Sequence, residues 1–248
     1  MTPNAASVTA APVSSPAQRV GTLDWRQLGA ELDARGCAVI PQLLGAHECR
    51  ELAAMYSQDQ WFRSRVVMAR HGFGRGEYRY FAYPLPAQIA QLREAFYARL
   101  APIANAWNQR LGIEARFPAM HAGFLARCHA AAQTQPTPLL LRYEAGDYNC
   151  LHQDLYGEHV FPLQVAVLLS QPGADFEGGE FVVTEQRPRM QSRVEVLNLR
   201  QGDAVLFAVS HRPVDGARGS YRVNLRHGVS RIRAGERHTL GVIFHDAV

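Results

Sequence analysis

The chain has 248 residues, enough for one domain with a sizeable core or for two small domains. Hydrophobic residues make up 47% of it, but no apolar run is long enough to span a bilayer, so we expect no membrane partner. The formal net charge of +4 is too small to demand a nucleic-acid partner and excludes no class of substrate. All 26 basic residues are arginine, and many of them fall between Arg187 and Arg237.

The cysteines and the first residues bear on the cellular compartment. The four cysteines form no C-x-x-C pair and no regular framework, which favours reduced thiols in a cytoplasmic protein. The first residues are rich in Ala, Pro, Ser and Thr and lack a basic segment followed by a short apolar core. We therefore expect residues 1–20 to be a flexible tail rather than a signal peptide.

Helical patterns dominate the segment that follows the tail. Leu28 and Leu32 recur at helical spacing, with Asp24 as a candidate N-cap and Gly36 as a candidate C-terminal stop. The remaining elements predicted here are a strand at Cys37–Ile40 and helices over about residues 49–56 and 86–107. The pattern assigns no structure to residues 62–83, where arginines alternate with aromatic residues and glycines.

Short β-type runs replace the helical patterns from about residue 138 onward. Eight runs are separated by turn residues, and they cover about 139–144, 151–154, 161–170, 180–185, 194–199, 204–209, 221–232 and 238–245. Eight short strands after helices are typical of an α+β protein with a double-stranded β-helix, or jelly roll, as its core. We predict a single domain over residues 21–248, with a helical preface at 21–137 and a catalytic core at 138–248.

A metal-binding motif occurs in the second β run. His152 and Asp154 are two residues apart, so on a strand their side chains share one face and can bind the same ion. Two histidines and one carboxylate on one face of an octahedron leave three positions open, which is the signature of non-haem Fe(II) oxygenases. The motif H-x-D by itself is weak, and a second histidine is required.

Two histidines compete for the third ligand position. His211 follows a predicted strand and is expected in a loop, whereas His227 lies on the seventh β run. The second and seventh strands are neighbours in a double-stranded β-helix, which favours His227. On the eighth run, Arg237 can bind a carboxylate through its planar guanidinium, and Thr239 shares its face. If His211 were the third ligand, Arg222 would lie at a similar distance along the chain and would take the place of Arg237. The final strand would then contribute no residue to the site.

These residues resemble the 2-oxoglutarate/Fe(II) dioxygenase superfamily. The resemblance covers residues 139–246 and rests on four features together: Tyr143 to Asp154 (YEAGDYNCLHQD), Gly178 to Phe181 (GGEF), Gly202 to Phe207 (GDAVLF), and His227 with Arg237-x-Thr239. The stretch from Thr184 to Arg193 looks like that of a bacterial family of such oxygenases, related to the AlkB group, that is expected to remove alkyl groups from damaged nucleic acid.

The resemblance implies cofactors and residue roles. It implies Fe(II) bound by His152, Asp154 and His227, with 2-oxoglutarate as cosubstrate and O2 as oxidant. It also implies that Arg237 pairs with the C5 carboxylate of 2-oxoglutarate, helped by Thr239, and that Tyr143 makes a second contact to that carboxylate.

The expected reaction is hydroxylation of a C–H bond, with release of succinate and CO2. Alkylated DNA or RNA is one expected substrate, and hydroxylation of an N-methyl carbon would demethylate it. AlkB-type enzymes carry a second arginine six residues after the first, and here that position is Ile243. A protein side chain or a small metabolite is therefore kept as an alternative substrate. Alternatives of another class are a non-catalytic jelly-roll binding protein and a zinc-dependent hydrolase.

Overall fold

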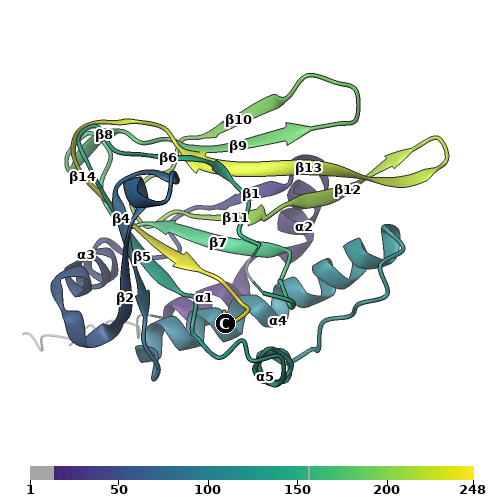
Figure 1. Cartoon of the computed structure of the whole chain (residues 1–248), viewed down its shortest axis with the longest axis horizontal. Helices are drawn as coiled ribbons and strands as arrows, with labels where there is room; N and C mark the ends of the chain where they lie inside the picture. Colours follow the sequence, from purple (N-terminus) through teal and green to yellow (C-terminus); the bar gives the residue numbers. More distant parts are fainter. Residues whose placement is uncertain (1–13, 156) are drawn as a thin grey trace, which may run out of the picture.

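Two antiparallel sheets pack face to face and enclose the core (Figure 1). The structure is a computed structural model and describes residues 14–155 and 157–248. The larger sheet has the order β1-β11-β7-β14-β5-β4-β2, with β8 paired to β14. The smaller sheet has the order β10-β9-β13-β6-β3, with β12 paired to β13. This arrangement confirms the predicted α+β jelly roll.

The strands vary in length from two to eleven residues. Their bounds are β1 Cys37–Ile40, β2 Phe62–Val67, β3 Gly74–Arg75, β4 Glu77–Phe81, β5 Leu139–Glu144, β6 Tyr148–His152, β7 Leu163–Leu168, β8 Phe176–Gly178, β9 Phe181–Gln186, β10 Arg193–Leu197, β11 Ala204–Ala208, β12 His211–Gly216, β13 Gly219–Val229 and β14 Ile232–Val242.

The helices at 16–22, 87–110 and 121–130 lie outside the larger sheet, on the side away from the smaller one, whereas the helix at 25–35 packs against β1, β11 and β12 (Figure 1). The helices are α1 Pro16–Thr22, α2 Trp25–Arg35, α3 Ala46–Ala54, α4 Ala87–Arg110 and α5 His121–Ala130, with short 3-10 turns at Met55–Ser57, Asp59–Trp61 and Met68–Arg70. As predicted, Asp24 caps the start of α2, and Gly36 ends it in the left-handed conformation. No helix in the described part of the chain has the length and apolarity needed to cross a bilayer.

Alternation along β13 explains how the smaller sheet contributes to the core. Val223, Leu225 and His227 are buried, whereas Arg222 and Arg226 between them are exposed. Successive side chains of a strand point to opposite faces, so these two sets face the core and the solvent respectively. His227 therefore enters the interior with the apolar side chains of its own strand.

Several segments differ from the sequence expectations. Helix α1 begins inside the range expected to be a tail, while residues 1–13 of that range lie outside the described residues. The unassigned segment 62–83 forms β2, β3 and β4, and these strands pair with one another or with β5 and β6. The region 21–137 therefore contributes four strands, including β1, to the two sheets.

Two short strands were missing from the predicted set. Strand β8 has only three residues, and β12 contains Pro213, a residue that normally argues against a strand. The expectation that His211 lies in a loop is therefore wrong, because His211 begins β12 and pairs with Asn224 of β13. Strand β6 ends at His152, so Asp154 lies just beyond a strand rather than on one.

The lowered pKa values of two buried histidines predict how the free energy of unfolding depends on pH. Burial, together with the charge of Arg93, lowers the pKa of both His121 and His245 to about 4. The unfolded chain then binds more protons below about pH 6.5, so stability should fall as the pH drops from 6.5 towards 4 and should level off below that. At pH 5 each histidine should cost about 2 kcal/mol relative to pH 7.5.

Urea unfolding at pH 7.5 and pH 5 measures this loss. The variant His245→Gln should recover about one histidine's share of it, whereas His47→Gln, at an exposed position, should recover none. An unfolding free energy that is the same at both pH values would contradict the assignment of these histidines as neutral in the folded state.

Candidate metal centre and active-site cavity

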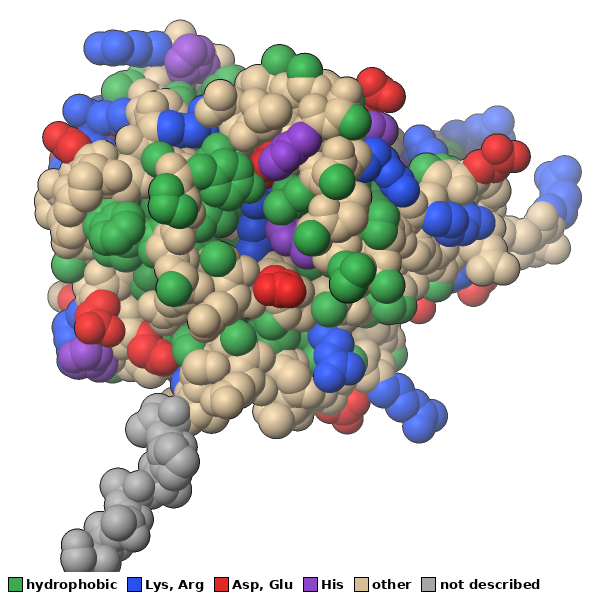
Figure 2. All heavy atoms as spheres, turned by 90° about the horizontal axis from the view of Figure 1, so that it is seen from below, with side chains coloured by type: hydrophobic (Ala, Val, Ile, Leu, Met, Phe, Trp, Pro, Cys, Tyr) green, Lys and Arg blue, Asp and Glu red, His purple; other side chains and the backbone are tan. Residues whose placement is uncertain are grey.

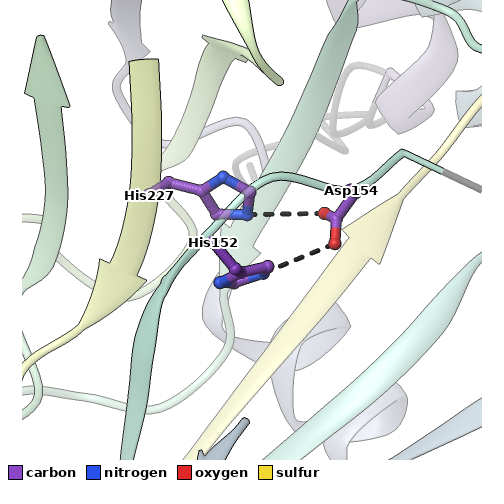
Figure 3. Close-up of side chains that lie close together, drawn as sticks. All are labelled: His152, Asp154 and His227. Atoms are coloured by element: carbon purple, nitrogen blue, oxygen red, sulfur yellow. Dashed lines mark ion pairs between the residues drawn. The ribbon is translucent and has the colours of Figure 1, made fainter. Parts of the chain in front are cut away.

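The strand register brings the H-x-D motif and His227 together. His227 on β13 pairs directly with His152 on β6 and, on its other side, with Val183 on β9. A bulge interrupts the β13–β6 pairing immediately after His227. The chain leaves β6 at His152, and Asp154 follows two residues later, turned toward both histidines (Figure 3).

The three side chains converge on one point between the sheets. Nε2 of His152 lies 3.4 Å from Oδ1 of Asp154, and Nε2 of His227 lies 3.4 Å from Oδ2 of the same carboxylate (Figure 3). The candidate ligand atoms all lie within 4.8 Å of one another, and the two imidazole centroids are 4.2 Å apart. Among the described residues, this is the one group of three or more His, Cys, Asp or Glu side chains spaced to hold a metal ion.

The protonation states of Asp154 and His227 suit a cation, whereas the hydrogen bond and charge of Asp154 outweigh burial and raise the pKa of His152. Burial opposes ionisation of Asp154, but hydrogen bonds and charge from both histidines outweigh it and hold the pKa of its carboxyl well below the usual range. Burial lowers the pKa of His227, which favours the neutral ring that binds metals. His152 Nδ1 contacts the carbonyl of Cys150 at 2.8 Å, and donating its proton there would leave Nε2 free to face the other two residues.

This donor set fits a divalent metal ion with open coordination positions. Ligands at about 2.1 Å from an ion and at right angles to each other are about 3 Å apart, close to the observed 3.4 Å. Three protein ligands from one side leave the other positions to small molecules. The role of His152, Asp154 and His227 as iron ligands stays a prediction.

Arg237 lies in the wall of the same cavity, and no described carboxylate forms an ion pair with it. Its side chain is buried with 1% exposure, and within the described residues it has no ion pair. The two other buried arginines each have one: Arg93 pairs with Asp246 at 2.7 Å, and Arg212 pairs with Glu185 at 2.5 Å. A buried, uncompensated charge is costly, so an anion bound next to Arg237 would be stabilising.

Thr239 and Tyr143 lie beside this arginine. Arg237 donates a hydrogen bond from Nη1 to Thr239 Oγ1 at 2.6 Å, while its Nε has no partner among the residues described. Tyr143 pairs with Arg237 across β5 and β14, and the guanidinium lies 5.7 Å from its ring centre. Burial raises the pKa of Tyr143 and keeps it a neutral hydrogen-bond donor. Burial also lowers the pKa of Arg237 to about 10, which leaves it charged at neutral pH.

The cavity between the sheets has a volume of about 240 Å³ and joins all six residues. Figure 2 shows hydrophobic side chains gathered around a hollow in which histidine and arginine side chains are visible. Much of the remaining lining is aromatic or amide-bearing: Phe73, Tyr78, Tyr80, Asn149, Gln153, Gln164, Phe181 and Phe207. Sequence reasoning missed most of these residues. Gln164 carried a usable signal, since it is a lone polar residue in the apolar strand Leu163–Leu168.

The rival residues lie outside this cluster. His211 is not part of the candidate metal group, and its Nδ1 contacts Ser210 Oγ at 2.8 Å. Arg222 is on the solvent-facing side of β13. In the segment 187–193, Arg187 and Arg193 both approach Glu185, at 3.0 and 3.7 Å, so their charges are partly neutralised.

Comparisons with known proteins agree with this geometry. Residues 76–247 match the model of a family described as "Oxygenase, catalysing oxidative methylation of damaged DNA". The uncharacterized protein Rv2227 of Mycobacterium tuberculosis is 51% identical over 167 residues, which cover 67% of this chain and 72% of that protein.

Solved structures with low sequence identity share the fold. A Pseudomonas putida prolyl-4-hydroxylase has a TM-score of 0.52 at 14% identity, covering 90% of this chain and 99% of its own. A 2OG-Fe(II) oxygenase family protein from Burkholderia pseudomallei has a TM-score of 0.53 at 18% identity, covering 89% and 90%. A Trichoplax adhaerens prolyl hydroxylase, solved with a hypoxia inducible factor peptide, has a TM-score of 0.56 at 16% identity, covering 92% and 91%.

Together with the family match, the jelly roll and its His-Asp-His cluster place the chain in the class of 2-oxoglutarate-dependent Fe(II) oxygenases, which are oxidoreductases that use O2. Within that class, the chain belongs to the oxygenase family described as acting on damaged DNA.

Proposed function

We propose that this oxygenase removes methyl groups oxidatively from alkylated nucleic acid. The main observation that supports an oxygenase active site is one cavity. This cavity joins the His152, Asp154 and His227 cluster to the buried Arg237, which has no ion pair among the described residues. A binding module needs no such combination, and a zinc hydrolase needs no buried arginine opposite its metal. The family description supports damaged DNA as the substrate.

One group of residues in the cavity binds the metal, and a second group binds the cosubstrate. His152, Asp154 and His227 hold Fe(II), and Arg237 binds the far carboxylate of 2-oxoglutarate with its guanidinium. Thr239 orients that guanidinium, and the neutral Tyr143 hydroxyl donates to the same carboxylate. Together with 2-oxoglutarate and O2, the iron supplies the oxidising power that hydroxylates a C–H bond and yields succinate and CO2. An N-methyl group so converted becomes N-hydroxymethyl, which leaves as formaldehyde and restores the N–H.

The cavity mouth offers features that suit a nucleic acid. Phe73 lines the cavity, is 43% exposed and stacks on His71 with centroids 5.3 Å apart. The exposed Arg70 and Arg75 flank these rings in the sequence. Stacking on aromatic side chains and contacts from arginine to phosphate are the usual means of binding single-stranded nucleic acid.

Release of formaldehyde tests the proposal. With Fe(II), 2-oxoglutarate and O2, the protein should release one formaldehyde per succinate from a single-stranded oligonucleotide that carries N-methylated adenine or cytosine. The duplex should react more slowly, because a stacked base must first be extruded to reach the iron. Binding should also weaken log-linearly with salt, and Arg70→Gln with Arg75→Gln should make the salt dependence shallower.

A different substrate class is the alternative. Hydroxylation of a protein side chain or a small metabolite would use the same iron site, and the Trichoplax relative was solved with a peptide. Succinate formation driven by a peptide or a metabolite, with no formaldehyde from any methylated oligonucleotide, would overturn the nucleic-acid proposal and leave the oxygenase assignment intact.

We also propose that residues 21–248 act as one oxygenase domain in the cytoplasm. Strands β1, β3 and β4 pair with strands of the C-terminal half, and β2 pairs with β4, so the segment 21–137 contributes to the same two sheets as the catalytic core. The four cysteines are all free, which is typical of a reducing compartment.

A further inference from the structure

The cavity contains one polar side chain that the proposed chemistry leaves without a task. Gln164 lies on β7, is 4% exposed and lines the cavity. Its buried Nε2 has no hydrogen-bond partner in the described ranges. Burying an amide nitrogen without a partner is costly, so a ligand that satisfies it would bind with a corresponding gain.

Another buried glutamine shows the usual arrangement. Gln133 is 0% exposed and uses both ends of its amide: Nε2 donates to the carbonyls of His159 and Asp246, and Oε1 accepts from the His159 backbone N–H. Gln153, which also lines the cavity, donates to the carbonyls of Ser210 and Leu225. Gln164 is therefore exceptional among these glutamines in having an amide nitrogen without a partner.

The position of Gln164 separates it from the cosubstrate end of the cavity. Its neighbour Val165 pairs with Val242 of β14, five residues beyond Arg237. At about 3.3 Å per residue, the backbone next to Gln164 lies roughly 17 Å along the strand from that of Arg237. Phe207, its partner on β11, packs against the ring of His227 with centroids 4.6 Å apart. Gln164 thus lies beside the metal cluster and beyond the reach of the anion site.

The wall of the cavity between these two ends includes a position that has no side chain. Gly241 lines the cavity and pairs with Ala166 of β7. A Cβ atom added at Gly241 would come within 2.7 Å of Leu139 Cδ2. Gly241 therefore accommodates the side chain of Leu139, which lines the same cavity.

The other walls at this end are aromatic. Tyr78 and Tyr80 both line the cavity, and their rings meet edge to face at 5.3 Å. They lie on β4, next to the β5 residues Leu141 and Leu139 that line the same cavity. Flat aromatic walls beside an amide whose nitrogen has no partner among the described residues are suited to a planar ring that has a hydrogen-bonding edge.

We propose that Gln164 is a specificity-determining residue whose amide pairs with the edge of an extruded nucleobase. This inference rests on the proposed function. The amide offers one donor and one acceptor side by side, which matches a base edge that presents an acceptor next to a donor. Aromatic stacking holds the plane of the base, and the amide selects which edge is presented to the metal.

The test compares Gln164→Leu with the wild type, using a short single-stranded DNA that carries one N-methylated adenine or one N-methylated cytosine. Calorimetry on the metal-loaded protein under anaerobic conditions measures binding of the oligonucleotide without turnover. We expect binding to weaken about 10- to 100-fold for at least one of the two bases. The kcat/KM for formaldehyde release should fall by a similar factor, whereas the KM for 2-oxoglutarate should not change.

Thermal unfolding of the ligand-free protein separates this function from a structural role. Gln164→Leu should melt at the wild-type temperature or above, since it removes an amide whose nitrogen has no partner. The matched control Gln133→Leu should melt lower, because it leaves two carbonyls and an N–H without their partner.

Three results would overturn the inference. One is unchanged oligonucleotide binding in Gln164→Leu when the wild type binds. Another is a raised KM for 2-oxoglutarate with unchanged oligonucleotide binding, which would assign the amide to the cosubstrate. The third is a wild type that binds and hydroxylates a peptide but no methylated oligonucleotide, in which case the proposed function fails as well.

Discussion

Replacing Asp154 or His227 with alanine should abolish both iron binding and 2-oxoglutarate turnover. Each residue supplies one of three converging ligand atoms, and the remaining two cannot hold the ion in one fixed geometry. The loss of metal affinity should exceed the roughly 10- to 100-fold effect of removing a group that only orients a ligand. Metal content after anaerobic loading measures it, together with the weak visible charge-transfer band expected when 2-oxoglutarate chelates Fe(II).

His211→Ala is the matched control for this prediction. His211 lies at the start of β12, outside the candidate metal group, so the variant should keep its iron, its charge-transfer band and its activity. The assignment of the distal ligand would be wrong if His211→Ala lost the metal while His227→Ala retained it.

Arg237→Ala should raise the 2-oxoglutarate concentration needed for half-maximal turnover at least about 100-fold without removing the metal. Loss of one partner from a desolvated ion pair costs about 3–5 kcal/mol, which corresponds to that factor or more. Arg237→Lys should recover only part of the affinity, because an ammonium cannot reproduce the two parallel hydrogen bonds of a guanidinium. Steady-state kinetics and metal analysis on the same preparations measure both effects.

One control variant makes this prediction specific. Arg222→Ala changes the rival arginine, which faces solvent, and should leave the 2-oxoglutarate requirement unchanged. An unchanged requirement in Arg237→Ala, with a raised one in Arg222→Ala, would move the anion site to the rival position.

The variants Arg237→Met and Arg93→Met should also differ in the stability of their ligand-free forms. Arg237→Met removes a buried charge that has no carboxylate partner, so it should be neutral or stabilising, whereas Arg93→Met leaves Asp246 buried with one partner fewer and should cost about 3–5 kcal/mol. A large loss of stability in Arg237→Met would show that the arginine serves the fold rather than a ligand.

Local patterns in the sequence determined much of this protein. The spacing of His152 and Asp154, the caps at Asp24 and Gly36, and the strand Leu139–Glu144 all follow from residue types within a few positions of one another. Such features depend on backbone geometry that neighbouring residues control, namely two-residue alternation in strands and capping at helix ends. For the same reason the jelly roll could be predicted from eight short β-type runs separated by turn residues.

The remaining features of the site and fold depend on pairing between strands that are far apart in the sequence. The choice between His227 and His211 depends on which strand lies beside β6, and the register that pairs His227 with His152 joins residues 75 positions apart in the sequence. Strands β2–β4 escaped prediction because their half-buried, arginine-rich faces carry little alternation. Strands β3 and β4 form by pairing with β6 and β5, and β2 forms by pairing with β4. The isolation of Arg237 and Gln164 is likewise a tertiary property, since it depends on which groups from other strands fail to reach them.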